Sequence, residues 1–337
     1  MSIHRTFRRL LLSALALCSG LAGAQSFCVY DPLGAGGDYY SLAKDYQLAA
    51  RRLGVSLDLR VYTDDGKLDT AFRAGQCDVA SMLGMRARQY NLFTGTLDAP
   101  SVIENYGQVR EVMTLLASPK MAHYMVSGAY EVVGLVPLGA AYAIVNDRSI
   151  NSLERANGKR VAVLGWDKTQ PLMARAFGAA PVGVDITQLG QVFKAGEVDV
   201  VVSPLQVYKA FELDKGVGHS GGIVRRPLFQ LSMQLVAHAD RFPAGFGQAS
   251  REYMSRQTDH ALGIVHNQEA AMDNRVWIFA ASSEVSQWNA TMRLFLDRMA
   301  STGYFDRHML GLLKQLRCQD GTGDKADCAG IDSVAIR

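Results

Sequence analysis

Short apolar segments alternate with amphipathic ones in the first third of the chain. Short apolar or alternating runs are typical of strands, and apolar positions that recur every three to four residues are typical of helices. On this basis the pattern predicts strands at residues 27–30, 55–62 and 77–82, and helices at 39–53 and 67–74. A strand–helix–strand–helix–strand order predicts a parallel sheet with right-handed crossovers.

The same order returns later in the chain. Strands are predicted at 159–164, 182–185 and 198–202, with a helix ending at Phe177 and another at 186–195. The clearest repeat between the halves is AGQCDV at 74–79 and AGEVDV at 195–200. Each segment predicts a glycine at a helix end followed by a buried strand. The repeat predicts two α/β lobes with a cleft between them.

The segment 124–145 is mostly apolar and long enough to cross a membrane. Glu131 and Pro137 argue against a span, and the favoured interpretation is a buried strand that crosses between the lobes. From Gln248 onward the pattern is helical, most clearly at 283–299 and 307–316. We therefore expect lobe I at 25–140 plus about 228–275, lobe II at 141–227, and C-terminal helices and a loop at 276–337 packed across both.

The first 24 residues have the pattern of a secretory signal peptide. Arg5, Arg8 and Arg9 precede an apolar run, and Ala22-Gly23-Ala24 matches the small-x-small cleavage motif. Cleavage before Gln25 and a periplasmic location are expected, with a retained membrane anchor as the alternative.

Lipidation at Cys18 is not favoured, because Leu17 stands where a lipoprotein box has a small residue.

The predicted signal holds three arginines and no acid, so the rest of the chain has 32 basic and 32 acidic residues. No Lys/Arg cluster remains, which argues against nucleic-acid binding. With 48% hydrophobic and 20% charged residues, the composition is that of a globular protein and excludes a disordered, collagenous or coiled-coil chain.

Four cysteines lie outside the predicted signal, namely Cys28, Cys77, Cys318 and Cys328. An even number in an exported chain predicts disulfides, and four cysteines allow three pairings. We favour Cys28–Cys77, which would link neighbouring strands, and Cys318–Cys328, which would close a short loop; free buried thiols are the alternative. The spacing fits no zinc site, and no cofactor is expected.

Several segments resemble, in order and spacing, the DctP-like solute-binding proteins of TRAP transporters. They are 75–83 (GQCDVASML), 97–100 (LDAP), 151–163, 178–182 (GAAPV) and 192–204, within a resemblance that covers roughly residues 27–300. The resemblance implies a type II periplasmic-binding-protein fold. It implies a binding protein rather than an enzyme, one that captures a small polar metabolite, organic acids included, and delivers it to a TRAP-type permease.

A closer resemblance is to a subgroup of solute-binding proteins, some of which carry the label of RND-type efflux components linked to aminoglycoside resistance. An RND pump needs many membrane spans, and this sequence offers none that fits.

One position departs from the TRAP family, which places an arginine in the strand after "GKK" to clamp a substrate carboxylate. That position is Ala162 here, and Arg160 lies two residues earlier on the same side of the strand. The family's "ENP" asparagine falls near Ser203. Either the clamp is displaced or it is absent, and an absent clamp favours the alternative of an accessory or sensor protein of an envelope complex with a degenerate cleft.

Ligands of two-lobed α/β folds bind beyond the carboxyl ends of the strands. This rule selects the loops 31–39, 81–88 and 165–170, where glycines and a helix N-terminus favour an anion and Trp166 is placed to stack on a ligand. The alternatives are that loop 31–39 is a plain turn, that Arg86 and Arg88 are solvated, and that Trp166 lies on the surface of its lobe. The candidate ligand-binding residues are Asp31, Gly36, Gly37, Asp38, Ser81, Met82, Arg86, Tyr142, Arg160, Trp166, Asp167 and Ser203.

A hydrolase is the remaining alternative. Residues 218–222 (GHSGG) match the GxSxG motif, which must follow a strand and open a helix. The preceding segment is helix-like and the following one is extended, so catalysis by Ser220 is not expected. The seven histidines show no clustered ligand spacing, and no metal site is expected.

Overall fold

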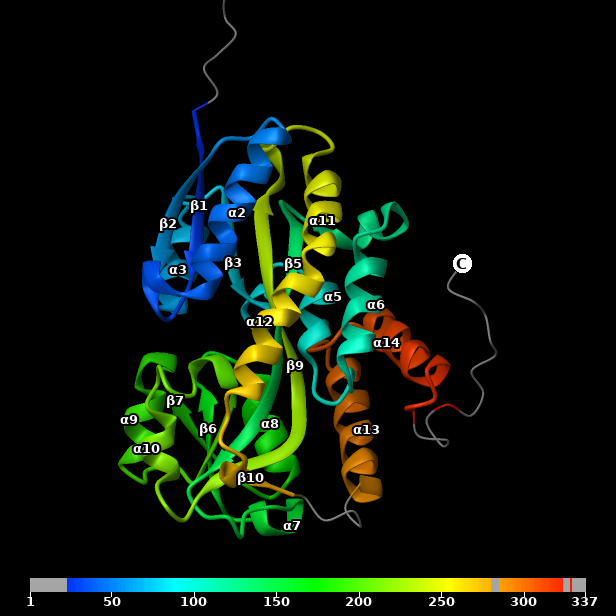
Figure 1. Cartoon of the computed structure of the whole chain (residues 1–337). Coiled ribbons are helices and arrows are strands. Elements are labelled where there is room, and N and C mark those ends of the chain that lie inside the picture. The colour runs from blue at the N-terminus through cyan, green and yellow to red at the C-terminus, as the bar shows by residue number, and fades with distance from the viewer. Residues whose placement is uncertain (1–22, 280–284, 324–327, 329–337) are drawn as a thin grey trace, which may run out of the picture.

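Two long antiparallel strands, β5 (Tyr130–Val145) and β9 (Gly222–His238), run through both lobes of the molecule (Figure 1). The computed structural model describes residues 23–279, 285–323 and 328; almost all of the predicted signal peptide lies outside them. The apolar segment 124–145 is therefore largely a strand that crosses between the lobes, as predicted. Among the described residues, no helix has both the length and the apolar character needed to cross a membrane.

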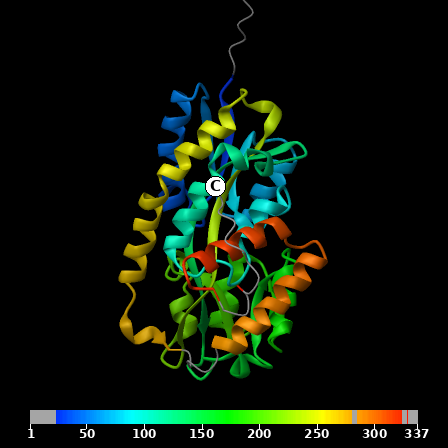
Figure 2. The same ribbon diagram turned by 90° about the vertical axis from the view of Figure 1, so that its right-hand side faces the viewer.

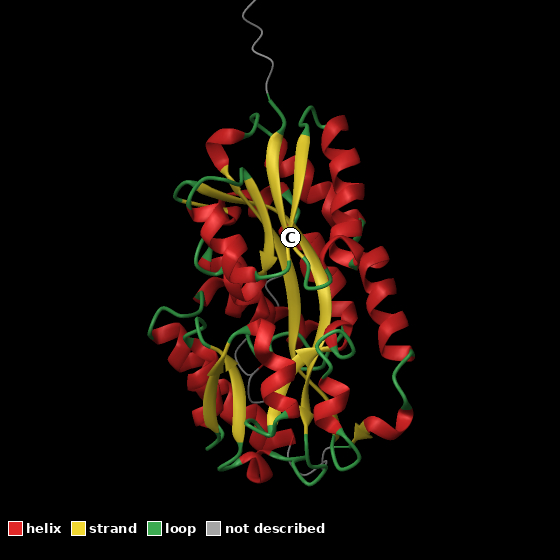
Figure 3. Ribbon diagram, turned by 90° about the vertical axis from the view of Figure 1, so that its left-hand side faces the viewer, coloured by secondary structure: helices red, strands yellow, loops and turns green. Residues whose placement is uncertain are grey.

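The lobes share one mixed sheet, with strand order β2-β1-β3-β9-β5-β8-β6-β7. Figure 3 shows β5 and β9 continuing from the strands of one lobe into those of the other. Short strands pair at the margins, β4 (Val126–Ser127) with β5 and β10 (Trp277–Ile278) with β9. The predicted parallel α/β halves are thus joined by an antiparallel pair at the centre.

Lobe I holds the first predicted unit. Its parallel strands are β1 (Gln25–Tyr30), β2 (Leu57–Tyr62) and β3 (Val79–Leu83), and its helices include α2 (Asp38–Arg52), α3 (Asp65–Arg73), α4 (Gly84–Ala87), α5 (Leu92–Gly95), α6 (Tyr106–Leu116) and α11 (Phe246–Arg256). Strand β3 pairs antiparallel with β9, which attaches the unit to the crossing strands.

Lobe II holds the second unit. Its parallel strands are β6 (Arg160–Leu164), β7 (Ala180–Val184) and β8 (Val200–Pro204), and its helices are α7 (Leu153–Ala156), α8 (Thr169–Ala176), α9 (Leu189–Lys194) and α10 (Leu213–Val217). Strand β8 pairs antiparallel with β5. Helix α12 (Thr258–Ala270) runs alongside the crossing strands and leads from lobe I toward β10 (Figure 1).

Short 3₁₀ helices connect the larger elements. They are η1 (Gly34–Gly36), η2 (Thr96–Asp98), η3 (Pro119–Met125), η4 (Ile186–Gln188), η5 (Leu205–Val207), η6 (Ala239–Arg241) and η7 (Asn274–Val276).

The C-terminal helices α13 (Val285–Ser301) and α14 (Arg307–Gln319) contact both lobes. Helix α14 packs on α5 and α6 of lobe I, whereas α13 packs on α8 of lobe II. Trp288 of α13 stacks on Phe177 at the end of α8, with 5.2 Å between the ring centroids. Figure 2 shows both helices together on one side of the molecule.

Both favoured disulfide pairings are confirmed. Cys28 of β1 is bonded to Cys77, which lies just before the neighbouring strand β3, and Cys318 of α14 is bonded to Cys328. The first bridge holds two adjacent strands of lobe I together.

The repeat between residues 74–79 and 195–200 corresponds to the same local geometry. Gly75 and Gly196 have φ angles of 70° and 72°, a region that favours glycine. Three residues later, the Asp78 carboxylate accepts a hydrogen bond from Ser26 N of β1 (2.7 Å), and Asp199 accepts one from Arg160 N of β6 (2.9 Å). Each aspartate therefore ties the start of one parallel strand to its neighbour.

Candidate functional site

A cavity of about 80 Å³ lies between the lobes, beside the crossing strands. Lobe I contributes Tyr30, Pro32, Tyr39, Leu83 and Met85, and the crossing strands contribute Leu138 and Leu231. Lobe II contributes Ala162, Leu164, Gln170, Ile186, Val202, Ser203, Pro204 and Phe211, among others. Tyr30, Leu83, Leu164 and Pro204 are the last residues of β1, β3, β6 and β8. The cavity thus lies where the parallel strands of both lobes end, the usual ligand position in such folds.

The lining is mainly apolar, and none of the described residues that line the cavity is charged. Polar side chains come from Tyr30, Tyr39, Gln170 and Ser203. Gln170 is held in place, since its Oε1 accepts a hydrogen bond from Leu164 N (2.8 Å) and its Nε2 lies 3.3 Å from Met85 Sδ of the other lobe. Ser203 Oγ donates to the Pro204 carbonyl at 3.2 Å.

The two tyrosines present hydroxyl groups that make no hydrogen bond within the described chain. Tyr30 is only 2% exposed. Burial, reinforced by the nearby Asp65 carboxylate, raises the pKa of Tyr30 above its usual value, and burial does the same for the pKa of Tyr39. Both phenols are therefore neutral at physiological pH and can donate or accept a hydrogen bond.

Next to the cavity, Arg86 of α4 stacks against Trp166, which lies in the loop between β6 and α8. The Arg86 Cζ atom is 3.6 Å from the centroid of the Trp166 ring. From the other side, Arg86 Nε donates to Asp65 Oδ2 (3.0 Å), and Arg86 Nη1 lies 3.7 Å from Asp69. The arginine is 4% exposed, so its charge is neutralised within lobe I while its face contacts lobe II.

Arg88 makes a second contact between the lobes. Its Nη1 donates to Thr169 Oγ1 of α8 (3.1 Å) and lies 3.8 Å from Asp167, while its Nε donates to the Gly95 carbonyl (3.2 Å). Asp167 in turn accepts hydrogen bonds from the backbone nitrogens of Thr169 (2.6 Å) and Gln170 (3.0 Å). The loops 81–88 and 165–170, both selected from the sequence, thus meet and fasten the lobes to each other.

The glycine-rich loop 31–39 binds a carboxylate that belongs to the chain itself. Asp31 is buried and accepts hydrogen bonds from Leu33 N (2.8 Å) and from Tyr40 N in the first turn of α2 (2.9 Å). A Cβ atom on Gly37 would collide with this carboxylate. Asp31 and Gly37 therefore shape the loop, and the anion-binding N–H groups expected at this helix are already used.

The other predicted residues are spread over several places. Gly36 is exposed with open space around it, and Asp38 is exposed and accepts from Gln268 Nε2 of α12 (3.0 Å). Met82 is fully buried in β3, and Ser81 lines a narrower cavity of about 20 Å³ within lobe I.

Tyr142 and Arg160 do not line the interlobe cavity. The Tyr142 hydroxyl donates to Glu269 of α12 (3.0 Å). Arg160 is the first residue of β6, whereas the cavity lies at the end of that strand, and its Nη2 and Nε bind the Asp199 carboxylate at 2.6 and 3.0 Å. Ala162, which occupies the clamp position of the resemblance, does line the cavity.

Several lining residues escaped the sequence interpretation. Tyr30 and Leu164 close predicted strands and Leu83 directly follows one, so the rule that ligands bind at strand ends was a usable signal for them. Leu138, Phe211 and Leu231 have no local signal, because they reach the cavity only through the path of the crossing strands and the packing of lobe II.

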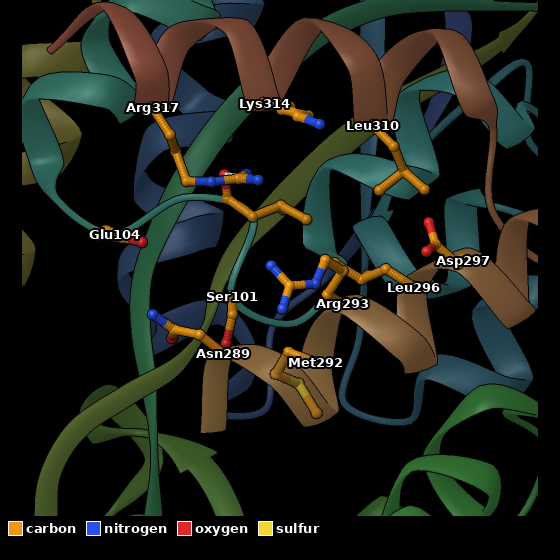
Figure 4. A pocket seen from close by; sticks show the side chains of 11 residues that line it. Ser101, Glu104, Asn289, Met292, Arg293, Leu296, Asp297, Leu310, Lys314 and Arg317 are labelled. Carbon is orange, nitrogen blue, oxygen red and sulfur yellow. Dashed lines mark hydrogen bonds between the residues drawn. The ribbon is translucent and has the colours of Figure 1, made fainter. Parts of the chain in front are cut away.

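A larger cavity of about 190 Å³ lies between α13, α14 and residues 101–104, away from the strand ends (Figure 4). It is lined by side chains of both charges, including Glu104, Asp297, Arg293 and Lys314. Arg317 donates to the Val102 carbonyl (2.7 Å), and Arg293 and Lys314 also have partners in the chain. The contact of Arg317 attaches α14 to the segment around Val102.

The sequence profile of the family described as "Solute-binding protein AdeT 1/2" matches residues 47–333. The chain belongs to this family. It is 38% identical over 301 residues to the "Probable solute-binding protein AdeT1" of Acinetobacter baumannii, which covers 89% of this chain and 99% of the relative. The "Probable solute-binding protein AdeT2" of the same organism is 23% identical over 226 residues, covering 67% of this chain and 95% of the relative.

The fold of this AdeT1/AdeT2-family chain is that of TRAP periplasmic solute-binding proteins. The structure from Ralstonia eutropha H16, with bound (S)-2-acetolactate, superposes with a TM-score of 0.72 at 11% identity, covering 88% of this chain and 99% of that one. The structure from Sulfitobacter sp. NAS-14.1, with bound β-D-galacturonate, gives 0.68 at 15% identity over 88% and 99% of the two chains. The predicted type II periplasmic-binding-protein fold and the TRAP-type resemblance are confirmed.

The surroundings of Ser220 differ from those of a GxSxG nucleophile. Helix α10 precedes the motif and strand β9 follows it, the reverse of the strand–turn–helix order. Ser220 is exposed, and its carbonyl accepts a hydrogen bond from Arg148 N. Within the described part of the chain, no group of three or more His, Cys, Asp or Glu residues is arranged to hold a metal ion.

Proposed function

We propose that this AdeT1/AdeT2-family chain captures a small molecule in the cavity between its lobes and delivers it to a membrane permease, as a binding protein rather than an enzyme. The observation that carries the proposal is the position of the cavity, where strands of both lobes end and where Arg86 and Trp166 close one lobe on the other. The TRAP-type structures that hold bound metabolites support the same site class and make a TRAP-type permease the expected partner.

The crossing strands supply a means of opening. Strand β5 has a register shift against β9 between Pro137 and Gly139, and Gly139 has a φ angle of 86°. Leu138, between these two residues, lines the cavity. Bulges and positive-φ glycines relax strand pairing locally, so bending here would separate the lobes without unfolding either.

A periplasmic location fits this role. Strand β1 begins at Gln25, directly after the predicted signal-peptide cleavage position. We propose that the exported chain starts at Gln25 and meets its permease at the membrane surface. Nucleic acid is not an expected partner, because the charges of the remaining chain balance.

A ligand screen with two readouts tests the proposal. The protein covering residues 25–337 would be screened by thermal shift against organic acids, amino acids, sugars, amides and aminoglycosides, and hits examined by small-angle X-ray scattering. A ligand at about 100 times its Kd stabilises the protein by about 2.7 kcal/mol. We expect stabilisation together with a smaller radius of gyration. A screen that yields neither, with protein freed of co-purified ligand by refolding, contradicts the proposal.

The second candidate is an accessory or sensor protein of an envelope complex. It is favoured by the interlobe contacts of Arg86 with Trp166 and of Arg88 with Thr169, because these contacts join the lobes without a ligand between them. A chain that closes without a ligand would present one fixed surface to a partner. Capture of an envelope protein that persists when the cavity is filled by Ala162→Trp would favour this candidate over the first.

A further inference from the structure

The residues that line and border the cavity between the lobes indicate the charge of its ligand. We infer that it takes an uncharged molecule with an apolar body and one hydrogen-bonding group such as an amide, ketone or alcohol, and that it discriminates against carboxylates. This inference rests on the proposed function, since it names the ligand class of the same cavity.

The first support is the lining itself. Leu83, Met85, Leu138, Leu164, Val202 and Phe211 surround the cavity from both lobes and the crossing strands. A carboxylate that enters such a lining loses its hydration without gaining an opposite charge, whereas an apolar body gains from leaving water.

The second support is that the arginines beside the cavity already have partners. Arg86 is bound to Asp65, at 3.0 Å from Nε, and stacked on Trp166. Arg88 donates to Thr169 and to the Gly95 carbonyl. Engaging a ligand carboxylate would break these contacts and leave a buried Asp65 unpaired, which is strongly unfavourable.

The third support is the local charge balance. Asp31, Asp65 and Asp167 are all buried near the loops that border the cavity, and Asp31 occupies the backbone N–H groups at the start of α2. The region therefore holds more carboxylates than it has cations to offer, and an anionic ligand would be repelled.

The fourth support is the set of neutral hydroxyls that face the cavity. The hydroxyls of Tyr30 and Tyr39 of lobe I make no hydrogen bond within the described residues, and Ser203 Oγ of lobe II makes one long contact, to the Pro204 carbonyl. A ligand that displaces water from the cavity must offer these hydroxyls a partner, because polar groups that lose contact with water are normally hydrogen-bonded. Because they come from both lobes, one carbonyl or hydroxyl group bound between them would favour closure.

Pairs of probes with one shape and different charge test the inference. Benzamide against benzoate, and isobutyramide against isobutyrate, would be titrated calorimetrically into the exported protein at pH 7. We expect each amide to bind at least tenfold more tightly than its carboxylate. A carboxylate that binds as tightly as its amide, or more tightly, overturns the inference.

Tyr30→Phe provides the matched variant, because it removes one hydroxyl and keeps the ring. We expect it to weaken amide binding about three- to tenfold, the usual effect of one net hydrogen bond. Tyr208→Phe is the control, since Tyr208 is also buried but lies outside the cavity lining. Unchanged amide affinity in Tyr30→Phe, with circular dichroism matching the wild type, counts against the role of Tyr30 and against the inference.

Failure of the inference is distinguishable from failure of the proposed function. If carboxylates bind and the radius of gyration falls, the chain is a solute-binding protein and only the inferred ligand class is wrong. If no compound of either charge class binds, both are overturned. Native mass spectrometry of protein purified from the periplasm gives an independent answer, because a co-purified ligand would be neutral if the inference holds and acidic if it does not.

Discussion

The guanidinium carbon of Arg86 lies 3.6 Å from the ring centroid of Trp166, and this pair joins lobe I to lobe II beside the cavity. The arginine reaches this position because Asp65, at the start of α3, neutralises it within its own lobe. An ion pair of one lobe therefore presents a flat cationic face to an aromatic ring of the other. Sequence patterns selected both residues as ligand contacts, and the structure places them against each other.

Removing the ring should favour the open form. A desolvated cation–π contact is worth about 2 kcal/mol, so Trp166→Ala is expected to increase the radius of gyration of the ligand-bound protein and weaken ligand binding by about tenfold or more. Scattering and calorimetry with the best ligand measure both effects. Lys168→Ala, an exposed position in the same loop, is the control and should change neither. Equal affinity in Trp166→Ala and wild type would show that the pair does not hold the lobes closed.

Breaking the buried ion pair should be more harmful than removing both partners. Asp65→Ala removes the carboxylate that is hydrogen-bonded to the buried Arg86 and leaves Asp69, at 3.7 Å, as its remaining salt-bridge partner, so it is expected to lower the free energy of unfolding by about 3 kcal/mol. Adding Arg86→Met removes that charge while keeping a long side chain on Trp166, so the double variant should be more stable than Asp65→Ala. Urea unfolding of Asp65→Ala and of the double variant tests this order. A double variant that is less stable than Asp65→Ala would contradict it.

Asp98 should make stability depend on pH. Burial raises the pKa of this carboxyl to about 7, although Ser232 donates to it from both its hydroxyl (2.6 Å) and its backbone nitrogen (3.1 Å). The unfolded carboxyl titrates near pH 4, so between about pH 4 and 7 the unfolded chain releases a proton that the folded protein keeps. The contribution of Asp98 to stability is therefore fully present below about pH 4 and is lost as the pH rises through 7.

Asp98→Asn isolates this effect because it keeps the shape of the side chain. The stability of the variant relative to wild type should increase as the pH rises from 4.5 to 8, as measured by urea unfolding at each pH. A constant difference across that range would show that Asp98 does not titrate there.

A positive charge in the cavity should change its ligand preference. Ala162 lines the cavity and is 8% exposed, so Ala162→Arg would place a guanidinium where carboxylates can form bidentate hydrogen bonds. We expect benzoate to bind the variant at least tenfold more tightly than it binds wild type. Arg160→Ala is the contrasting variant at the other end of the same strand, and it should leave all ligand affinities within about twofold. Loss of binding in Arg160→Ala would contradict the placement of the site.

The two disulfides should contribute unequally to stability. Cys28–Cys77 spans 49 residues and Cys318–Cys328 spans 10. Loop-closure entropy assigns about 4 kcal/mol to the longer loop and about 3 kcal/mol to the shorter. Thermal unfolding of Cys28→Ala/Cys77→Ala should therefore show the larger decrease in Tm compared with Cys318→Ala/Cys328→Ala. The reverse order would mean that the C-terminal loop stabilises more than its length explains.

Local patterns predicted most of the regular structure outside the crossing strands. The expected helix at 39–53 is α2 (Asp38–Arg52), and the expected strand at 159–164 is β6 (Arg160–Leu164). Only the first part of β9 was predicted, as an extended segment at 223–228. Its continuation at 229–235 (FQLSMQL) alternates apolar and polar residues as a strand does, a signal that the sequence interpretation did not use. The alternation does not show that the polar members Gln230, Ser232 and Gln234 are buried too. Gln234 tolerates burial because its Nε2 donates to Thr94 O (2.9 Å), a contact made across 140 positions of sequence.

The candidate site was less predictable than the fold. The loops 81–88 and 165–170 were correctly brought together, because the carboxyl ends of the parallel strands of both lobes face the same cleft in this kind of fold. Several charged side chains of these loops and of loop 31–39, however, already bind other groups of the chain. Asp31 binds the start of α2, Arg86 binds Asp65, and Arg88 binds Thr169. A residue type shows what a side chain can bind, but not whether a neighbour already binds it.

The sequence by itself determined the two α/β units, the even number of cysteines that favours two disulfides, the strand character of residues 130–145 and the resemblance to TRAP-type binding proteins. These follow from periodicity, cysteine spacing and motif order, which depend on residues close together in the chain or on a repeated plan. Only the tertiary structure decided that Arg160 binds Asp199 outside the cavity lining while Ala162 lines it, and that Tyr30 and Ser203 face the same space. The reason is physical: which end of a strand a ligand can reach, and which charges remain available to it, depend on how distant segments pack against each other.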